Sequence, residues 1–483
     1  MDKLDAVQLT NWWPGTSDVF LRYGYTQNTT GISGQVESLM AYSSGTASKL
    51  FGVAGDSIYD VSSSGAVGAA AVTGLTNSRF QYANMTTSGG SYLVCVNGAD
   101  KQQVYTGSAW AKDGDGAPYD ITGVNSNTLI GVNVFKSRLW YVQEDSLKVW
   151  YLALGAIGGA ATALDLSAVF SMGGYIMAMG TWTIDAGYGV DDYAVWVTSK
   201  GEAAVYRLTD PTSPSGISLI GIFVIGAPIG RRCFMKYAGD MLLICQDGVV
   251  PLSGALQSSR LNPRVSLTDK IQFAMSEAIS SYGANFGWQL VYFPKENQLY
   301  LNVPVAEGSS QQQYVMNTIT KSWSNFTGWY ANCWEIFNDN VYFGGNGYVG
   351  LAWNTNSDNG AAIQGTAIQS FQTYGSSAQL KRFTLMRPNL RTNGVPSLYA
   401  NVNVDFNLTD STNPLSFSPT SYGVWDVGLW DSAVWGSDLV TQQNWQGVNA
   451  IGYTAAPFLK VSASGINVRW VNTDLVFERG GIL

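Results

Sequence analysis

Apolar residues recur along this chain in short runs that are separated by polar turns. The stretch from Arg138 to Tyr151 is typical, because an aromatic-rich run, Leu-Trp-Tyr-Val, is followed by a polar break and then by a second run, Val-Trp-Tyr. Two apolar runs that flank a short polar break predict a β-hairpin. Similar pieces recur around Leu50, Leu93, Val195, Leu243, Leu299 and Val341.

The spacing of these pieces predicts the fold. Successive anchors lie 43, 46, 56, 48, 56 and 42 residues apart, counted between Leu50, Leu93, Leu139, Val195, Leu243, Leu299 and Val341. A degenerate period of roughly 40–50 residues with several strands in each unit is the signature of propeller blades. The chain is therefore expected to be all-β, with a β-propeller of about seven blades. The alternative is a large sandwich, whose hairpins would look alike because hairpins in general do.

The sequence divides into three predicted regions and one inserted helix. Residues 1–45 hold short strands that are expected to close the propeller, and residues 46–355 are expected to form it. Residues 356–483 follow a turn-rich seam and read as a smaller, sandwich-like C-terminal β module. The helix is predicted after Ser266, because Ser266 and Asp269 have the form of a capping box and apolar residues then recur at helical spacing up to Gly283.

The composition argues against an enzyme. Charged residues make up only 12% of the chain and the net charge is −8, which does not suit a protein that grips nucleic acid through its phosphates. The sequence contains no histidine, so the commonest general base and metal ligand is missing. The four cysteines are far apart and are expected to be buried, reduced thiols. We therefore expect no catalytic residue, no cofactor and no metal site.

Two groups of residues are candidates for contact with a partner. Trp425, Trp430 and Trp435 are spaced five apart, and they either staple the core of the C-terminal module or contact a partner or a sugar. Arg231 and Arg232 either bind a neighbouring acidic surface or form a solvated pair at the start of a strand. Residues 151–184 are apolar, but glycine and alanine make up their bulk and Asp165 interrupts them, so no membrane span is expected.

Several segments together resemble the tail proteins of short-tailed bacteriophages (podoviruses). They are Asn11-Trp12-Trp13-Pro14 followed by residues 19–25, Val134–Trp140, Gly230–Phe234 and the ending Phe477–Gly481. The similarity is to the tail nozzle or hub, also called tail tubular protein B or packaged-DNA stabilisation protein. It covers essentially the whole length and rests on overall texture, because these segments contain no diagnostic motif.

The resemblance implies a structural role in the virion. Such proteins are built on a β-propeller and form a sixfold ring below the portal and its adaptor. The implied partners are other copies of the chain, the adaptor and portal-side proteins, the tail fibres or spikes, and genomic DNA that passes through the lumen without specific binding. The chain would be made in the cytoplasm of the host bacterium. The alternatives are a carbohydrate-binding propeller that recognises the host surface and a tail enzyme that cleaves glycans.

A nozzle also needs a constriction that holds packaged DNA until infection. The best candidate is the glycine- and alanine-rich excursion at roughly 155–180, because glycine permits movement and apolar side chains can close a pore around a symmetry axis. The candidate gate residues are Phe170, Met172, Tyr175 and Met177. The alternative is that the excursion is an ordinary packed loop on one face of the propeller.

Overall fold

The computed structural model describes residues 5–185, 190–256, 266–410, 414–415 and 439–482. Contacts between residues divide the chain into two compact units. Unit 1 contains residues 1–26, 313–329 and 351–483, and unit 2 contains residues 27–312 and 330–350. The predicted regions 1–45 and 46–355 are thus each shared between the two units. The division falls inside strands β4 (Gly24–Ser43), β27 (Ser310–Asn317) and β31 (Asn346–Thr355).

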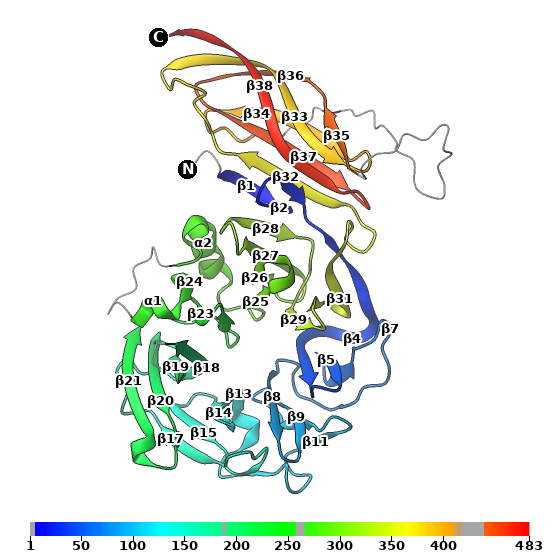
Figure 1. Cartoon of the computed structure of the whole chain (residues 1–483). Coiled ribbons are helices and arrows are strands. Elements are labelled where there is room, and N and C mark those ends of the chain that lie inside the picture. Colours follow the sequence, from blue (N-terminus) through cyan, green and yellow to red (C-terminus); the bar gives the residue numbers. More distant parts are fainter. Residues whose placement is uncertain (1–4, 186–189, 257–265, 411–413, 416–438, 483) are drawn as a thin grey trace. The chain divides into compact units, whose positions relative to one another are not determined.

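Unit 2 is a β-propeller, whose sheets follow one another around a ring (Figure 1). In chain order, the first three groups of strands are β4 (Gly24–Ser43), β5 (Ser48–Ala54), β6 (Ser57–Asp60) and β7 (Gly65–Ala66); β8 (Gln81–Thr87), β9 (Gly90–Val96), β10 (Gln103–Tyr105) and β11 (Trp110–Lys112); and β13 (Leu129–Phe135), β14 (Arg138–Gln143), β15 (Lys148–Tyr151) and β17 (Thr162–Asp165). The next two are β18 (Ile176–Asp185), β19 (Val190–Thr198), β20 (Glu202–Leu208) and β21 (Ile217–Val224); and β22 (Phe234–Tyr237), β23 (Asp240–Cys245) and β24 (Gly248–Pro251). The last two are β25 (Gln289–Phe293) with β26 (Gln298–Ala306), and β29 (Cys333–Phe337) with β30 (Asn340–Gly344) and β31 (Asn346–Thr355). A short parallel pair, β12 (Ile121–Thr122) with β16 (Gly159–Ala160), lies outside these groups.

The blades can be counted at the centre of unit 2. The first strand of each of the seven groups, β4, β8, β13, β18, β22, β25 and β29, contributes residues to one central cavity. Seven inner strands around a single cavity are the geometry of a seven-bladed propeller. The predicted β-propeller of about seven blades is therefore confirmed, and the alternative of one large sandwich is wrong for unit 2.

The alternating aromatic residues of the opening motif serve two cores at once. Strands β14 and β15 pair antiparallel, with Trp140 opposite Tyr151 and Tyr141 opposite Trp150. Trp140 packs in a core with residues of the following blade, including Trp196, whereas Tyr141 packs in a core with residues of the preceding blade. Both faces of β14 are covered in this way. For this reason the sequences of the strands are nearly continuous apolar runs and do not alternate strictly between apolar and polar residues.

The inserted helix is confirmed, but its start is not the predicted capping box. Helix α2 (Gln272–Tyr282) follows the 3-10 turn η4 (Asp269–Ile271), and Met275 and Ala278 lie on its buried side. The hydroxyl of Ser266 donates instead to the carbonyl of Val249 at 3.1 Å, because this segment runs beside strand β24. A second short helix, α1 (Leu252–Leu256), follows β24 and was not predicted. In the described ranges, the other 3-10 turns are η1 (Ser126–Thr128), η2 (Pro214–Gly216) and η5 (Pro294–Glu296).

Unit 1 has two sheets packed over one core. One contains β1 (Ala6–Thr10), β28 (Trp323–Thr327), β32 (Ile363–Gln369), β37 (Ala455–Ala463) and β34 (Ser397–Val404), with β27 (Ser310–Asn317) leading into β28 along the chain. The other contains β2 (Trp12–Pro14), β3 (Val19–Leu21), β38 (Val468–Ile482), β33 (Gln379–Thr392), β35 (Val440–Gln443) and β36 (Gln446–Gly452). Residues of both sheets meet in the core, as in a β-sandwich. Within it, Trp12 packs against Trp470, at a ring-centroid distance of 6.2 Å.

Among the described residues, no helix has both the length and the apolar character that crossing a bilayer requires.

Candidate functional site

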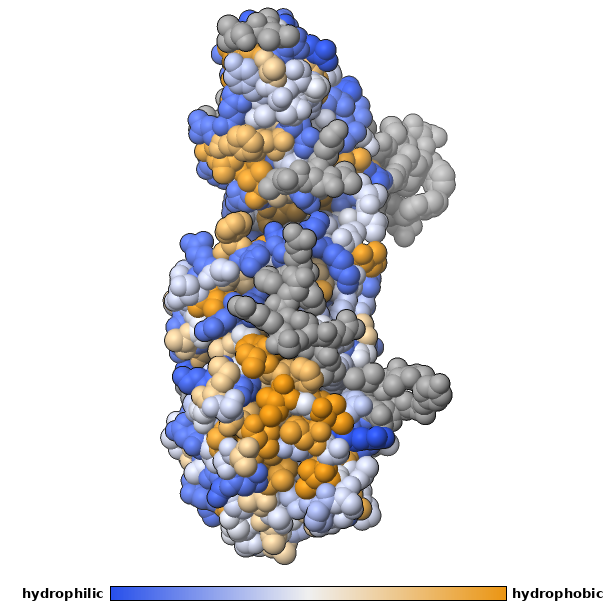
Figure 2. Space-filling view, turned by 90° about the vertical axis from the view of Figure 1, so that its left-hand side faces the viewer, coloured by the Kyte–Doolittle hydropathy of each residue, from blue (hydrophilic) through white to orange (hydrophobic). Residues whose placement is uncertain are grey.

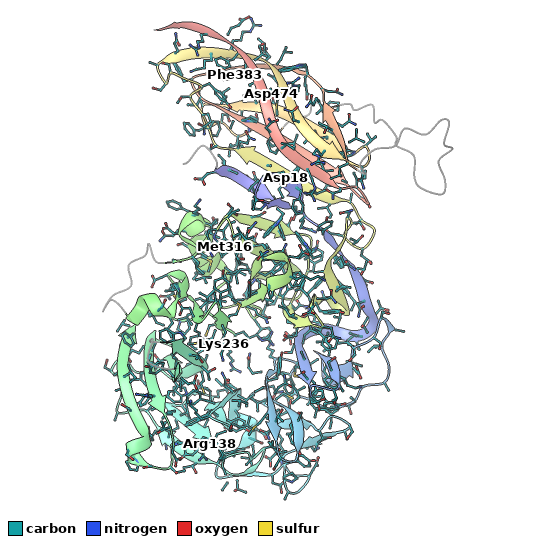
Figure 3. The ribbon with its side chains drawn as sticks, viewed as in Figure 1. Asp18, Arg138, Lys236, Met316, Phe383 and Asp474 are labelled. Atoms are coloured by element: carbon teal, nitrogen blue, oxygen red, sulfur yellow. The ribbon has the colours of Figure 1, made fainter. Side chains whose placement is uncertain are left out.

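The centre of the propeller contains a cavity of about 270 Å³, which we call the axial cavity. Three basic side chains and one acidic side chain line it, together with amides, aromatic rings and methionines. The charged residues are Arg231, Arg232, Lys236 and Glu335. Lys236 lies in β22, on the inner side of the ring (Figure 3). Because successive blades present their first strands to the axis, residues that are far apart in the sequence meet in this cavity.

Arg232 is the most embedded of the basic groups. Its Nη2 donates to Ser38 Oγ at 2.6 Å and to the carbonyl oxygen of Phe80 at 3.1 Å, so one guanidinium nitrogen ties the β22 blade to two other blades. The same guanidinium lies over the ring of Phe286, 4.9 Å from its centroid. Burial lowers the pKa of Arg232, but arginine stays charged in proteins even so. The cavity thus holds a fixed positive charge.

Glu335, in β29, is the acidic residue of the cavity. Its Oε1 accepts a hydrogen bond from the backbone N–H of Ile336 at 3.1 Å, and its carboxylate also has a hydrogen bond with Tyr82 of the β8 blade. Burial raises the pKa of Glu335 to about 7, although Tyr82, the Ile336 amide and the charge of Arg232 all act in the opposite direction. Burial and the neighbouring Glu335 also raise the pKa of Tyr82 well above its ordinary range.

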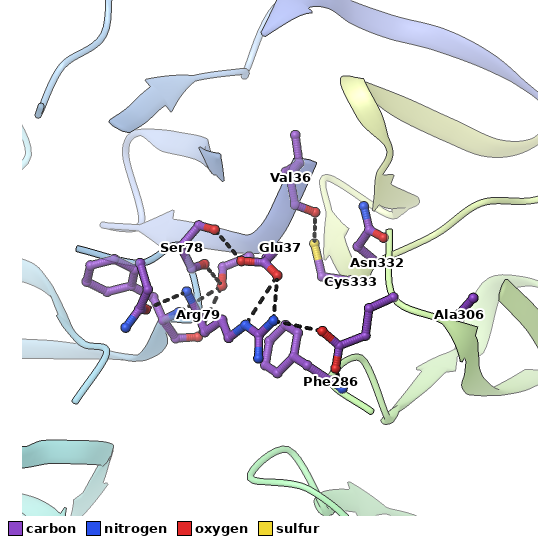
Figure 4. A network of polar contacts seen from close by, with 12 residues as sticks. Val36, Glu37, Ser78, Arg79, Phe286, Ala306, Asn332 and Cys333 are labelled. Atoms are coloured by element: carbon purple, nitrogen blue, oxygen red, sulfur yellow. Dashed lines mark hydrogen bonds and ion pairs between the residues drawn. The ribbon is translucent and has the colours of Figure 1, made fainter. Parts of the chain in front are cut away.

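A second polar network lies beside the cavity and fixes its wall (Figure 4). Arg79 pairs with Glu37 at 3.1 Å and with Glu307 at 3.0 Å, so it bridges two acids from different blades. The ring of Phe286 also contacts the guanidinium of Arg79, at 4.3 Å from its centroid. Ser78 donates a short hydrogen bond to Glu37. Arg79 and Arg232 contact the same Phe286 ring, so this network is in direct contact with a residue that lines the cavity.

The structure separates the two predicted contact arginines. Arg231 lies at the edge of the cavity and pairs with Glu144 at 2.8 Å. Arg232, one residue later, points to Ser38 and Phe80. The interpretation of a solvated pair is wrong for Arg232, because the two arginines lie in a turn and the Arg232 side chain is bonded to neighbouring blades. Trp425, Trp430 and Trp435 lie outside the described residues, so their contact with a partner or sugar stays a prediction.

The candidate gate residues do not share one environment. Phe170 is 7% exposed and belongs to the core that includes Trp140 and Trp196, whereas Met172 is 50% exposed. Tyr175 is half-buried, and Met177, in β18, is also half-buried. A gate at this excursion stays a prediction, but Phe170 could contribute to it only by leaving the core.

The Glu202 carboxylate holds the chain between these candidates. It accepts hydrogen bonds from the backbone N–H of Ser171 at 3.0 Å and of Met172 at 2.7 Å. Burial acts to raise the pKa of Glu202, but these bonds and that of the Ser171 hydroxyl outweigh it, and the pKa is lowered. The excursion is therefore anchored to strand β20 at this point.

The same region contains a feature that the sequence analysis missed. Strand β21 is the last of its sheet, and no strand pairs with its outer edge in the part of the chain that the structure describes. Exposed apolar side chains project from it. Met172 lies next to this strand, because its backbone N–H bonds to Glu202 and Glu202 is the cross-strand neighbour of Val224. We call this surface the apolar rim: Met172, Leu219, Ile220, Ile222 and Val224. Figure 2 shows an extensive hydrophobic patch on this side of unit 2, and α1 lies at one end of β21 (Figure 1).

The sequence did contain a signal for the rim. Residues 217–224 read Ile-Ser-Leu-Ile-Gly-Ile-Phe-Val, without a charged residue. Native edge strands are usually protected by charged residues, proline or a covering element. The run does not by itself predict an exposed surface, because sequence alone does not show which strand of a sheet is at its edge.

Within the described ranges, no group of three or more His, Cys, Asp or Glu side chains is placed so that it could hold a metal ion. The four cysteines are free and buried, as expected. Burial raises the pKa of the Cys233, Cys245 and Cys333 thiols to about 12, and it raises that of Cys95 further. These thiols are packing groups rather than nucleophiles.

No protein-family model matches this sequence, and no curated protein matches it either. Solved structures do resemble the chain. One is BBS1N, solved in complex with ARL6DN, at 10% identity and a TM-score of 0.41, with 70% of this chain and 99% of that one covered. Another is the β-propeller domain of Myceliophteria thermophila Cps50 (Swd1), at 12% identity and 0.42, with 68% and 99% covered. A third is YCF48 bound to D1 peptide, at 11% and 0.36, with 74% and 96% covered. At these identities the likeness concerns the fold alone.

Proposed function

We propose that this protein is a structural subunit of a short bacteriophage tail, at the position of the nozzle or hub, and that neighbouring copies of the chain join it in a ring. The observation that carries the proposal is the apolar rim, since an apolar edge strand that no described residue covers is unusual in a free monomer. The resemblance of the sequence to podoviral tail proteins is the reason for placing this assembly in a phage tail. The fold is compatible with this role, although a propeller by itself implies no function.

The size of the rim favours a subunit contact. The exposed surface of its five residues is roughly 400 Å², within the range of the largest apolar patch on a typical monomer, which is often functional. A stable interface buries about 800 Å² on each partner, so the rim would form the apolar centre of a larger contact. Since residues 217–224 carry no charge, the surface that covers them should be apolar as well.

A second apolar patch makes another copy of the chain a suitable occupant. A ring of identical subunits needs two different, complementary surfaces on each copy. In unit 1, Leu385 and Val476 are exposed cross-strand neighbours on β33 and β38, and Ile451 is exposed on β36. Arg387 on the same sheet pairs with Asp474 at 2.6 Å and covers the ring of Trp445 at 4.7 Å. Exposed aliphatic residues beside tryptophan and arginine are typical of interface centres.

The axial cavity of a single propeller is too small to be the DNA channel. Its volume of about 270 Å³ is below that of a pocket for a drug-sized molecule. A channel would therefore lie on the symmetry axis of the ring, between subunits. The net charge of −8 suits a lumen that DNA crosses without binding tightly, because like charges repel the phosphates.

The test is to locate the protein in phage particles. Antibodies against the purified chain should label the tail tip of short-tailed particles produced with it, and averaged electron-microscopy images should show a ring of copies there. Pre-immune serum is the control for non-specific labelling. Particles that contain the chain only elsewhere, or that are complete and infectious without it, would contradict the proposal.

A further inference from the structure

We propose that the axial cavity of the propeller is a binding site for a small anion with a carboxylate or phosphate group, and that Arg232 is its principal contact. The proposal concerns unit 2 alone and does not depend on the role in a phage tail. It rests on three features of the cavity: unused hydrogen-bond donors, the balance of charge and the size.

The unused donors belong to Arg232. A guanidinium has five N–H donors, and the two acceptors that Arg232 has, Ser38 Oγ and the Phe80 carbonyl, both contact Nη2. In the described part of the chain, neither Nε nor Nη1 of Arg232 has a hydrogen-bond partner, although the residue lines the cavity. Neither atom is among the fully buried polar atoms that lack a partner, so both are open to solvent in the cavity. An anion inside the cavity would therefore replace that solvent with charge-assisted hydrogen bonds.

The balance of charge favours an anion. Arg231, Arg232 and Lys236 line the cavity against one acid, Glu335. Glu144 compensates Arg231, and Tyr82 and the Ile336 amide occupy the carboxylate of Glu335. Among the described residues, neither Arg232 nor Lys236 has a carboxylate at ion-pair distance; Glu37 and Glu335 act on Arg232, and Asp192 on Lys236, only from farther away. Arg232, with the exposed Lys236 nearby, can therefore attract a counter-ion with oxygen acceptors into this partly open cavity.

The size and rigidity of the site limit the ligand. A cavity of about 270 Å³ admits inorganic phosphate or a small carboxylate, but not a polymer. Neighbouring amides are already engaged: Gln289 Nε2 donates to the Trp334 carbonyl at 2.8 Å, and Asn133 Nδ2 donates to the Met179 carbonyl at 3.2 Å. These bonds fix the wall of the cavity, and the contacts of Arg232 with Ser38, Phe80 and Phe286 hold its planar guanidinium in place.

The experiment is a calorimetric titration of the purified full-length protein. Inorganic phosphate and acetate are titrated separately at constant ionic strength, with chloride as the reference anion, so that the two arms distinguish phosphate from carboxylate. We expect saturable binding of at least one of them. Arg232→Gln should weaken it at least tenfold, Glu335→Gln should tighten it severalfold because an opposing carboxylate is removed, and Lys148→Gln, an exposed residue outside the cavity, should leave it unchanged.

The outcomes decide the proposal even if one variant does not fold. Heat from both anions that is no greater than that from chloride, or binding that Arg232→Gln leaves intact, would overturn it. Should Arg232→Gln fail to fold, Glu335→Gln is decisive: tighter binding supports the site, and unchanged binding contradicts it. An equal loss of binding in Arg232→Gln and Lys148→Gln would also contradict it, because the effect would then be one of overall charge.

Discussion

The guanidinium of Arg22 holds both carboxylate oxygens of Asp358, with Nη1–Oδ1 at 2.8 Å and Nη2–Oδ2 at 2.7 Å, across 336 positions of the chain. Arg22 Nη2 also donates to the Thr327 carbonyl at 2.6 Å, and Nε donates to Asn11 Oδ1 at 2.9 Å. The ring of Trp329 lies 4.5 Å from the guanidinium carbon. One buried side chain thereby joins the three sequence segments of unit 1.

We expect Asp358→Asn to destabilise unit 1 strongly. The side chain of Arg22 is completely buried, so the substitution leaves a buried charge without its partner, which costs about 3–5 kcal/mol. The matched control is Asp410→Asn, which breaks the exposed pair of Lys460 and Asp410 and should cost less than about 1 kcal/mol. Urea unfolding followed by tryptophan fluorescence measures both. Equal effects of the two substitutions would show that the Arg22 network does not stabilise the unit.

The raised pKa of Glu335 leads us to expect that the folded protein loses stability as the pH rises. Burial raises its pKa in the folded protein to about 7, above the ordinary value, so the folded state binds more protons than the unfolded state between these values. Stability should therefore fall as the pH rises from about 4.5 to about 7, by up to ~3 kcal/mol for this group. Glu335→Gln should remove this component and be more stable than the wild type at pH 8. Unfolding curves between pH 5 and 8 give the comparison, and parallel pH profiles of the two proteins would contradict it.

Charges placed in the apolar rim should prevent assembly without unfolding the protein. The double substitution Leu219→Lys with Ile222→Lys alters exposed side chains, so each should change the free energy of unfolding by about 0.5 kcal/mol or less. The double variant should no longer associate with other copies of the chain, and light scattering measures this association. Phe273→Lys is the control, since Phe273 is 95% exposed on α2, outside the rim. Assembly as in the wild type would show that the rim is not a subunit contact, and loss of the fold would show that these side chains stabilise the propeller itself.

Phe170→Ala distinguishes a packed loop from a gate. A side chain buried among Trp140, Trp196 and their neighbours should cost about 3–5 kcal/mol when truncated to alanine. A loosely held gate residue should cost little, and the half-exposed Met172 provides the comparison through Met172→Ala. Thermal unfolding of the two variants measures the difference. Nearly equal, small effects would support the gate, because Phe170 would then contribute little to the core.

The four cysteines should be unreactive in the folded protein. All four are buried, and burial raises the pKa of each thiol, so little of the reactive thiolate is exposed at neutral pH. Mass spectrometry after brief treatment with iodoacetamide should find no label under native conditions and four labels in denaturant. Rapid native labelling of any of them would indicate that its blade opens locally.

The propeller could be predicted from sequence because its signal is local and repeated. Each hairpin, such as the pairing of Trp140 with Tyr151, is visible in neighbouring residues, and the period of the repeats supplies the closed arrangement. The capping box after Ser266 has equally local residues but was wrong. A neighbouring strand supplied Ser266 with a different acceptor, the Val249 carbonyl.

The candidate sites could be predicted only in part, because long-range contacts create them. Arg232 was selected from sequence for its charge, but nothing local predicts that it meets Ser38 and Glu335 at the axis of a ring. The pairing of Arg22 with Asp358 is equally invisible, since sequence separation carries no information on which buried charges meet. The apolar rim depends on which strand ends its sheet, and that is decided by the fold.

The most direct test of the central claim is hydrogen–deuterium exchange of the β21 peptide, Ile217–Val224, in the free subunit and in assembled particles. Among the described residues no strand pairs with the outer edge of β21, so the amides on that edge, which do not bond to β20, should exchange rapidly in the free subunit. If a neighbouring copy covers the apolar rim, exchange should slow markedly in the particle, whereas the exposed turn at Asn338–Asp339 should be unaffected as an internal control. Equal exchange of β21 in the two states would contradict the account.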